Sequence, residues 1–215
     1  MVSAMSFSGF SNRQEASRAA ADLMADKLFD RLKQPGRAAM IVSGGTTPAQ
    51  CFNALRGVDL DWSRVDVALT DERDVSVCHE ASNERMVREI LMQGAASAAT
   101  FLPCGDESIA SLVASPACCL VGMGEDGHFA SIFPDNAALD VLLDPAEPPG
   151  YLPVTTTASE FGRVTANLSL LLLSPLIVLL VFGREKRRLL EAPRAYPILR
   201  LISQTKTPVE IFWSA

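Results

Sequence analysis

Short, mostly apolar runs alternate with helical patterns along this chain of 215 residues, and this alternation most restricts the fold that it can adopt. The apolar runs cover residues 38–42, 65–70, 117–121, 176–182 and 209–213. Helical patterns cover residues 11–34, 82–92 and 184–191, and a further helix begins at Pro48, a residue favoured in the first helical turn. Apolar strands that alternate with helices are typical of parallel sheets covered on both faces. We therefore predict an α/β protein with a mainly parallel, Rossmann-like sheet flanked by helices on both faces.

The rest of the chain fits a single domain over residues 1–215, because it contains no repeat, no low-complexity segment and no clear boundary. Weaker patterns predict short strands at residues 154–157 and 164–166, and the proline-rich residues 144–153 read as a loop within the domain. Residues 1–10 are small and polar and lack the positive charges that begin a signal peptide.

One apolar stretch, residues 168–182, is long enough that its length should be compared with that of a membrane-spanning helix. It has 15 residues, whereas a spanning helix needs about 20. Ser174 and Pro175 also interrupt it. We expect a short helix that ends near Ser174 and a buried strand after it, with no insertion into a membrane.

Composition excludes several classes of function. The chain has 19 Lys and Arg against 25 Asp and Glu, a net charge of −6, and nucleic-acid-binding surfaces usually show a basic excess. A local pocket can still bind an anion. The five cysteines include no C-x-x-C motif, and Cys118 and Cys119 are adjacent within an apolar run, so neither a disulfide framework nor a zinc site is expected. These features predict a reduced, cytoplasmic protein.

Four polar segments each follow a predicted strand, at residues 43–48, 70–74, 122–128 and 183–186. Ligands of open parallel sheets bind outside the carboxyl ends of the strands. We expect these segments to converge on one site, and their convergence is the main functional signal in the sequence.

The first segment joins Gly44 and Gly45 to Thr46 and Thr47 at a helix start. Glycines allow close approach to the backbone, and free N–H groups at a helix N-terminus attract phosphate. The alternative is a plain turn between strand and helix, with threonine as the cap.

The second segment packs three carboxylates around Arg73. Arg73 is suited to grip a phosphate or sugar hydroxyls while the acids, Asp71 among them, fix its orientation. The alternative is a solvated run of charges. His79, in the polar loop that follows, reads as a surface histidine.

The third segment surrounds an Asp126-x-His128 pair with glycines. Histidine titrates near neutral pH and is a natural general base, which Asp126 can orient. The alternative is a histidine that caps a helix beginning near Phe129. In the fourth segment, Lys186 lies in a first helical turn, where a cation is unfavourable unless an anion compensates it. A surface lysine is the alternative there, and Arg163 is a further cation close to predicted strands.

Together these residues predict a phosphate-binding pocket with two or three cations and one histidine base. The sequence has no G-x-S-x-G motif that would mark a serine nucleophile, and no cluster of metal ligands. The expected chemistry is acid–base catalysis on a small phosphorylated molecule, with water or an internal group as the nucleophile.

Three motifs now resemble those of a known family: SGGTTP at residues 43–48, TDER at residues 70–73 with Ser82-Asn83-Glu84 after it, and GMGEDGHFASIFP at residues 122–134. Residues 163–165 and 183–186 match more weakly. Over residues 11–213 the chain resembles the glucosamine-6-phosphate isomerase/6-phosphogluconolactonase family, in particular its lactonase branch. The wider superfamily includes glucosamine-6-phosphate deaminase and ribose-5-phosphate isomerase.

The resemblance implies hydrolysis of 6-phosphoglucono-1,5-lactone in the oxidative pentose phosphate pathway, without metal or cofactor. Separately, we expect a monomer, because the sequence shows no coiled-coil and no obvious interface segment. It makes His128 the base that activates water and Asp126 its support. Its implied substrate-binding residues are Gly44, Gly45, Thr46, Thr47, Asp71, Arg73, Asn83, Arg163 and Lys186. Backbone N–H groups near Gly44 and Gly45 are candidates for stabilising the oxyanion.

The chain also departs from the family pattern. Phe129 stands where the family usually has a small residue, often Thr, and the segment between residues 101 and 118 is short. The deaminase branch carries Asn-Glu-Pro after the DGH motif, whereas residues 131–134 here contain no acid, which favours the lactonase. A non-catalytic sugar-phosphate sensor is the other alternative, but the length and net charge leave no room for a basic DNA-binding module.

Overall fold

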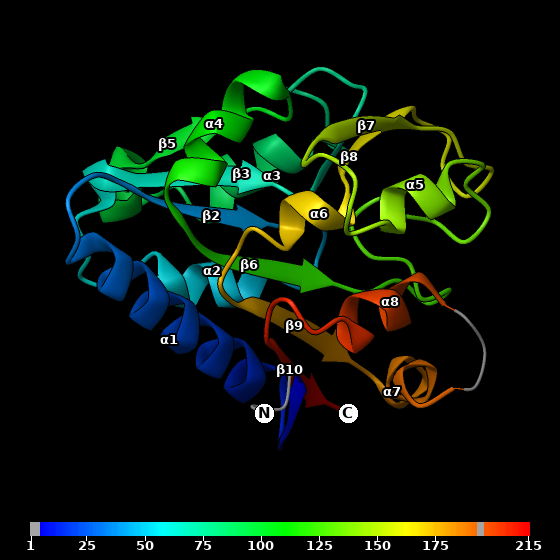
Figure 1. The fold of residues 1–215 in the computed structure, drawn as a ribbon. Helices are drawn as coiled ribbons and strands as arrows, with labels where there is room; N and C mark the ends of the chain where they lie inside the picture. Colours follow the sequence, from blue (N-terminus) through cyan, green and yellow to red (C-terminus); the bar gives the residue numbers. More distant parts are fainter. Residues whose placement is uncertain (1–4, 193–195) are drawn as a thin grey trace.

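A seven-stranded parallel sheet forms the centre of the protein in a computed structural model that describes residues 5–192 and 196–215 (Figure 1). Its order is β1-β10-β9-β6-β2-β3-β5, and every neighbouring pair is parallel. In that order the strands are β1 (Met5–Phe10), β10 (Val209–Ser214), β9 (Ile177–Phe182), β6 (Pro116–Gly122), β2 (Ala38–Val42), β3 (Val65–Leu69) and β5 (Thr100–Leu102). The predicted parallel α/β architecture is confirmed.

Helices cover both faces of this sheet because its central strands are apolar on both sides. Successive side chains of β2 point to opposite faces, so Met40 and Ile41 belong to two separate cores. One face packs against α1 (Arg13–Leu32), α2 (Ala49–Leu55) and α3 (Asn83–Ile90). The other packs against α4 (Asp106–Ala114), α5 (Leu139–Leu143), α6 (Leu168–Leu171) and α8 (Pro197–Ser203). Figure 1 shows α1 and α6 on opposite sides of β6.

A second, three-stranded antiparallel sheet lies beyond the carboxyl end of β3. It consists of β4 (Asp71–Arg73), β8 (Arg163–Ala166) and β7 (Tyr151–Val154). The Ala166 N–H donates to the Thr70 carbonyl over 2.7 Å, which ties the small sheet to the end of β3. This sheet corrects two expectations. The strand predicted at residues 154–157 ends at Val154, and part of the predicted loop at residues 144–153 is β7.

The sequence patterns missed other elements whose stability comes from their neighbours. β1 has no continuous apolar run and is held as an edge strand by parallel pairing with β10. The short elements α4, α5, α8 and β5, and the 3-10 turns Trp62–Arg64 and Gly94–Ala98, were also not predicted. α7 (Arg184–Leu190) follows β9 as expected.

The apolar stretch at residues 168–182 divides as predicted into a helical turn and a strand, α6 and β9. Within the described part of the chain, we find no helix with the length and apolar character needed to cross a bilayer. No helix begins near Phe129 either. Phe129 instead forms an isolated bridge with Ile132, and the next helix, α5, begins at Leu139, so His128 is not a helix cap.

Candidate active site

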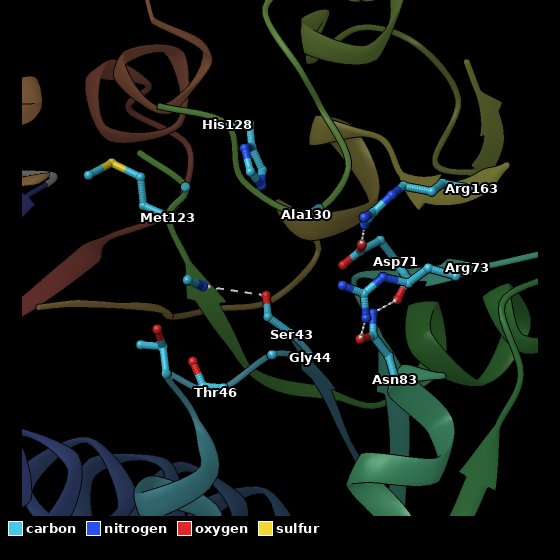
Figure 2. A pocket seen from close by; sticks show the side chains of 14 residues that line it. Ser43, Gly44, Thr46, Asp71, Arg73, Asn83, Met123, His128, Ala130 and Arg163 are labelled. Carbon is cyan, nitrogen blue, oxygen red and sulfur yellow. Dashed lines mark hydrogen bonds and ion pairs between the residues drawn. The ribbon is translucent and has the colours of Figure 1, made fainter. Parts of the chain in front are cut away.

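The carboxyl ends of the central strands surround a cavity of about 230 Å³ (Figure 2). Its walls follow β2, β3 and β6 and include one residue of β8. It is lined by Ser43, Gly44, Gly45, Thr46, Thr47, Asp71, Arg73, Asn83, Gly122, Met123, Gly124, His128, Ala130 and Arg163. Segments far apart in the sequence therefore meet in one place, as the parallel topology requires.

The loop after β2 lines the cavity with residues 44–47, and its backbone donors are unused: among the described residues, no hydrogen bond uses these N–H groups. Gly45 has a φ of +85°, a left-handed conformation that glycine adopts without strain. A run of free N–H groups beside a helix start favours an anionic ligand.

Gly44 also sets the distance between this loop and α3. A Cβ atom built on Gly44 would overlap the carboxamide of Asn83. We expect Gly44→Ala to displace Asn83, and with it Arg73, so that kcat/KM falls about 100-fold. Gly57→Ala is the matched control, because the same test gives only an ordinary 3.6 Å contact there. Steady-state kinetics of both variants test this expectation, and equal activities would contradict it.

Arg73 is oriented by Asn83 and by a backbone carbonyl. Its Nη1 donates to the Asn83 Oδ1 and to the carbonyl of Ala81, the latter over 3.0 Å. The flanking acids do not hold the guanidinium, which corrects our expectation. Glu72 instead caps α3, since its carboxylate accepts the N–H groups of Asn83 and Glu84 at 2.8 and 2.7 Å.

One donor of Arg73 remains unused. Its Nε is buried and has no hydrogen-bond partner in the part of the chain that the structure describes. An unsatisfied buried donor costs about 1–3 kcal/mol, and a bound acceptor would remove that cost.

Asp71 connects the second cation, Arg163, to a buried polar network. The Asp71 carboxylate accepts the hydroxyls of Ser131 at 2.6 Å and Thr70 at 2.9 Å, and it lies 3.5 Å from Nη1 of Arg163. Burial lowers the pKa of Arg163, and the neighbouring Arg73 lowers it further, while Asp71 opposes both effects. A buried guanidinium with a second one beside it forms a site that an anion would stabilise.

His128 projects toward the same cavity from the turn after β6 (Figure 2). Its Nδ1 lies 2.5 Å from the Asp126 Oδ1, and no other contact of the described residues engages the ring nitrogens. Nε2 is therefore the nitrogen left for a ligand. Gly124 makes this arrangement possible, because a Cβ there would overlap the imidazole.

Ala130 bends the chain after this histidine. It is the one non-glycine residue with a positive φ, +49°, in the described ranges. That conformation costs about 1–2 kcal/mol. After this bend the two side chains have different roles. His128 lines the cavity, and Ser131 contacts Asp71.

Two of the predicted site residues do not line the cavity. Asp126 contacts Nδ1 of His128, and Lys186 donates from Nζ to the carbonyl of Met123 over 2.6 Å. His79 is exposed, and its ring packs against Phe161 at 5.5 Å. No group of three or more metal-binding side chains occurs in residues 5–192 and 196–215.

Several residues that line or support the cavity lie in the predicted segments and motifs but were not singled out as site residues. They are Ser43, Thr70, Gly122, Met123, Gly124, Ala130 and Ser131. Ser43 follows one predicted strand and Thr70 ends the next, so their position was a usable signal. Ser131 carried no such signal, because its partner Asp71 is 60 residues away.

The parallel sheet, the row of free N–H groups and the paired guanidinium groups define an α/β protein with a site for a small anionic ligand. A model of the family of glucosamine-6-phosphate isomerases and 6-phosphogluconolactonases matches residues 11–213. The chain belongs to this family.

Curated relatives and solved structures agree with that assignment. A 6-phosphogluconolactonase of Caulobacter vibrioides is 35% identical over 95% of each chain, and one of Mesorhizobium japonicum is 35% identical over 97% of this chain and 94% of its own. The structure of a 6-phosphogluconolactonase from Shewanella baltica superposes with a TM-score of 0.89 at 34% identity, covering 98% of both chains.

A monomeric glucosamine-6-phosphate deaminase shares the fold, with a TM-score of 0.76 at 18% identity. It covers 98% of this chain and 97% of its own. The fold alone therefore does not separate the two activities, and the residues of the cavity have to do so.

Proposed function

We propose that this protein hydrolyses 6-phospho-D-glucono-1,5-lactone to 6-phospho-D-gluconate in the oxidative pentose phosphate pathway. The observation that carries the proposal is one cavity lined both by a histidine with a free Nε2 and by two guanidinium groups. The lactonase relatives, at 35% identity over nearly their whole length, support the same activity. Residues 131–134 supply no acid of the kind that the deaminase branch carries.

In the proposed mechanism, His128 acts as the general base. Its Nε2 takes a proton from water as the water oxygen attacks the lactone carbonyl, and Asp126 stabilises the imidazolium through Nδ1. The tetrahedral oxyanion then collapses and breaks the ring C–O bond. The imidazolium returns its proton to the departing ring oxygen, so the histidine is regenerated and no metal or cofactor is required.

The remaining cavity residues bind two different negative charges, the phosphate of the substrate and the oxyanion that forms during the reaction. Arg73 and Arg163 carry fixed positive charge and suit the phosphate, and the unused Nε of Arg73 is one donor for it. The free N–H groups of residues 44–47, which include Thr46 and Thr47, are suited to stabilise the oxyanion. Asn83 positions Arg73, Asp71 positions Arg163, and Lys186 holds the Met123 carbonyl.

The direct test is hydrolysis of freshly generated 6-phosphogluconolactone, corrected for its spontaneous hydrolysis. We expect the purified protein to accelerate 6-phosphogluconate formation, and we expect a chelator such as EDTA to leave the rate unchanged. Absence of acceleration would refute the lactonase assignment. Loss of activity with EDTA, restored by a divalent cation, would refute the metal-independent mechanism.

The cellular setting is part of the same proposal: a cytoplasmic monomer. All five cysteines are free thiols, and burial raises the pKa of Cys51 to about 12, so this thiol is unreactive. Free thiols are typical of a reducing compartment. Sedimentation at micromolar concentration tests the oligomeric state, and a dimer would contradict it.

A further inference from the structure

A buried aromatic ring, that of Phe133, lies against both reactive parts of the site without lining the cavity. Its centroid is 4.3 Å from that of the His128 imidazole, with the two planes at 36°. The guanidinium carbon of Arg163 lies 5.4 Å from the same ring. Phe133 is 3% exposed and packs in the core on the α6 and α8 face of the sheet.

The imidazole has two contacts that together restrict its orientation. Asp126 holds Nδ1, which fixes one edge of the ring but leaves rotation about that hydrogen bond. The Phe133 ring blocks this rotation by packing against the imidazole. Because Phe133 is itself fixed in the core, it positions the imidazole without contacting a ligand.

The ring also lies close to one permanent and one transient positive charge. Arg163 is always charged, and the imidazole becomes charged when it accepts a proton. The face of a phenyl ring is negative and attracts cations within about 6 Å of its centroid. An aliphatic side chain would keep the packing but remove this attraction.

Other polar and charged groups lie in or near the segment that carries His128 and Phe133. Asp126 contacts Nδ1, Lys186 reaches the Met123 carbonyl in the same turn, and Tyr196 packs against Gly127. Arg163 lies on Phe133, and exposed Glu125 precedes Asp126 in the chain. Substitution of Phe133 leaves all of these groups in place, so a change in titration would report the ring.

We propose that Phe133 is a positioning residue. Its ring packs against both His128 and Arg163, and it stabilises the imidazolium that forms during turnover. This inference rests on the proposed function, in which His128 is the base. It makes Phe133 a determinant of both the rate and the pH dependence of hydrolysis.

The test compares Phe133→Leu with Phe129→Leu. Phe129 is 0% exposed and belongs to the same segment and the same core, so its variant controls for lost packing. For Phe133→Leu we expect kcat to fall about tenfold. The acidic limb of the kcat profile should move to lower pH by about half a unit, because the imidazolium loses its aromatic neighbour. Phe129→Leu should lose thermal stability but keep the pH profile.

NMR titration of the His128 ring protons gives a readout that does not depend on turnover, and the His79 signal serves as an internal reference. We expect the His128 midpoint to move to lower pH in Phe133→Leu while that of His79 stays constant. An unchanged His128 midpoint in the folded variant, or equal shifts in both Leu variants, would overturn the proposal. If Phe133→Leu does not fold, Phe133→Met provides the same test. Failure of His128 as base would appear separately, as an active His128→Ala variant.

Discussion

Replacement of His128 by alanine is expected to lower kcat for 6-phosphogluconolactone by about two to four orders of magnitude, the range for loss of a general base. The imidazole is the titratable group with a free nitrogen in the cavity, whereas Asp126 does not line the cavity and contacts Nδ1 instead. KM should change much less than kcat, since Arg73 and Arg163 still bind the phosphate. Steady-state kinetics, corrected for spontaneous hydrolysis, measure both constants.

The chain provides its own control for this experiment. Its second histidine, His79, is exposed and packs against Phe161 outside the cavity lining. His79→Ala should therefore keep the wild-type rate. Wild-type turnover by the His128 variant would remove this residue from the mechanism, whatever the control shows.

Replacement of Arg73 by methionine is expected to raise KM for the phosphorylated lactone by about 10- to 100-fold. Hydrogen bonds to charged groups contribute about 1.5–3 kcal/mol, and methionine retains the aliphatic packing of arginine without its donors. KM for unphosphorylated gluconolactone should change much less, because that substrate lacks the charged phosphate that the guanidinium is proposed to bind. The ratio of the two KM values is the measurement.

Arg85→Met is the matched control for Arg73. Arg85 lies on α3 and contacts Glu89 and the Cys78 carbonyl, outside the cavity. We expect wild-type KM values for both substrates. If Arg73→Met raised KM equally for both lactones, Arg73 would not be the residue that recognises the phosphate.

The sequence patterns predicted the elements that are stabilised by their own apolar content. β2, β3, β6 and β9 each bury nearly all their side chains, and their apolar runs predict them with small errors at the ends. β1 and β4 escaped prediction, because polar edge strands such as MSFSGF and DER are stabilised by partners distant in sequence.

The candidate site was likewise predicted in part from the sequence. The strand ends placed the loop at Gly44, the acidic segment at Asp71 and the turn at His128 beside one another, and the structure brings these three to one cavity. The sequence did not indicate that Lys186 would instead bind a backbone carbonyl, or that Asn83 rather than an acid would orient Arg73. These partners depend on side-chain geometry, which no local pattern encodes.

By itself, then, the sequence determined the parallel sheet, the edge at which ligands bind and the residue types available for acid–base chemistry. Strand period and burial are local properties, and the parallel arrangement aligns every carboxyl end. Only the tertiary structure decided which charges meet. The contact of Arg163 with Asp71 joins residues 92 positions apart, and the ring of Phe133 reaches both His128 and Arg163. Such contacts form when distant segments pack together, because short-range electrostatic and aromatic interactions require the final arrangement of the chain.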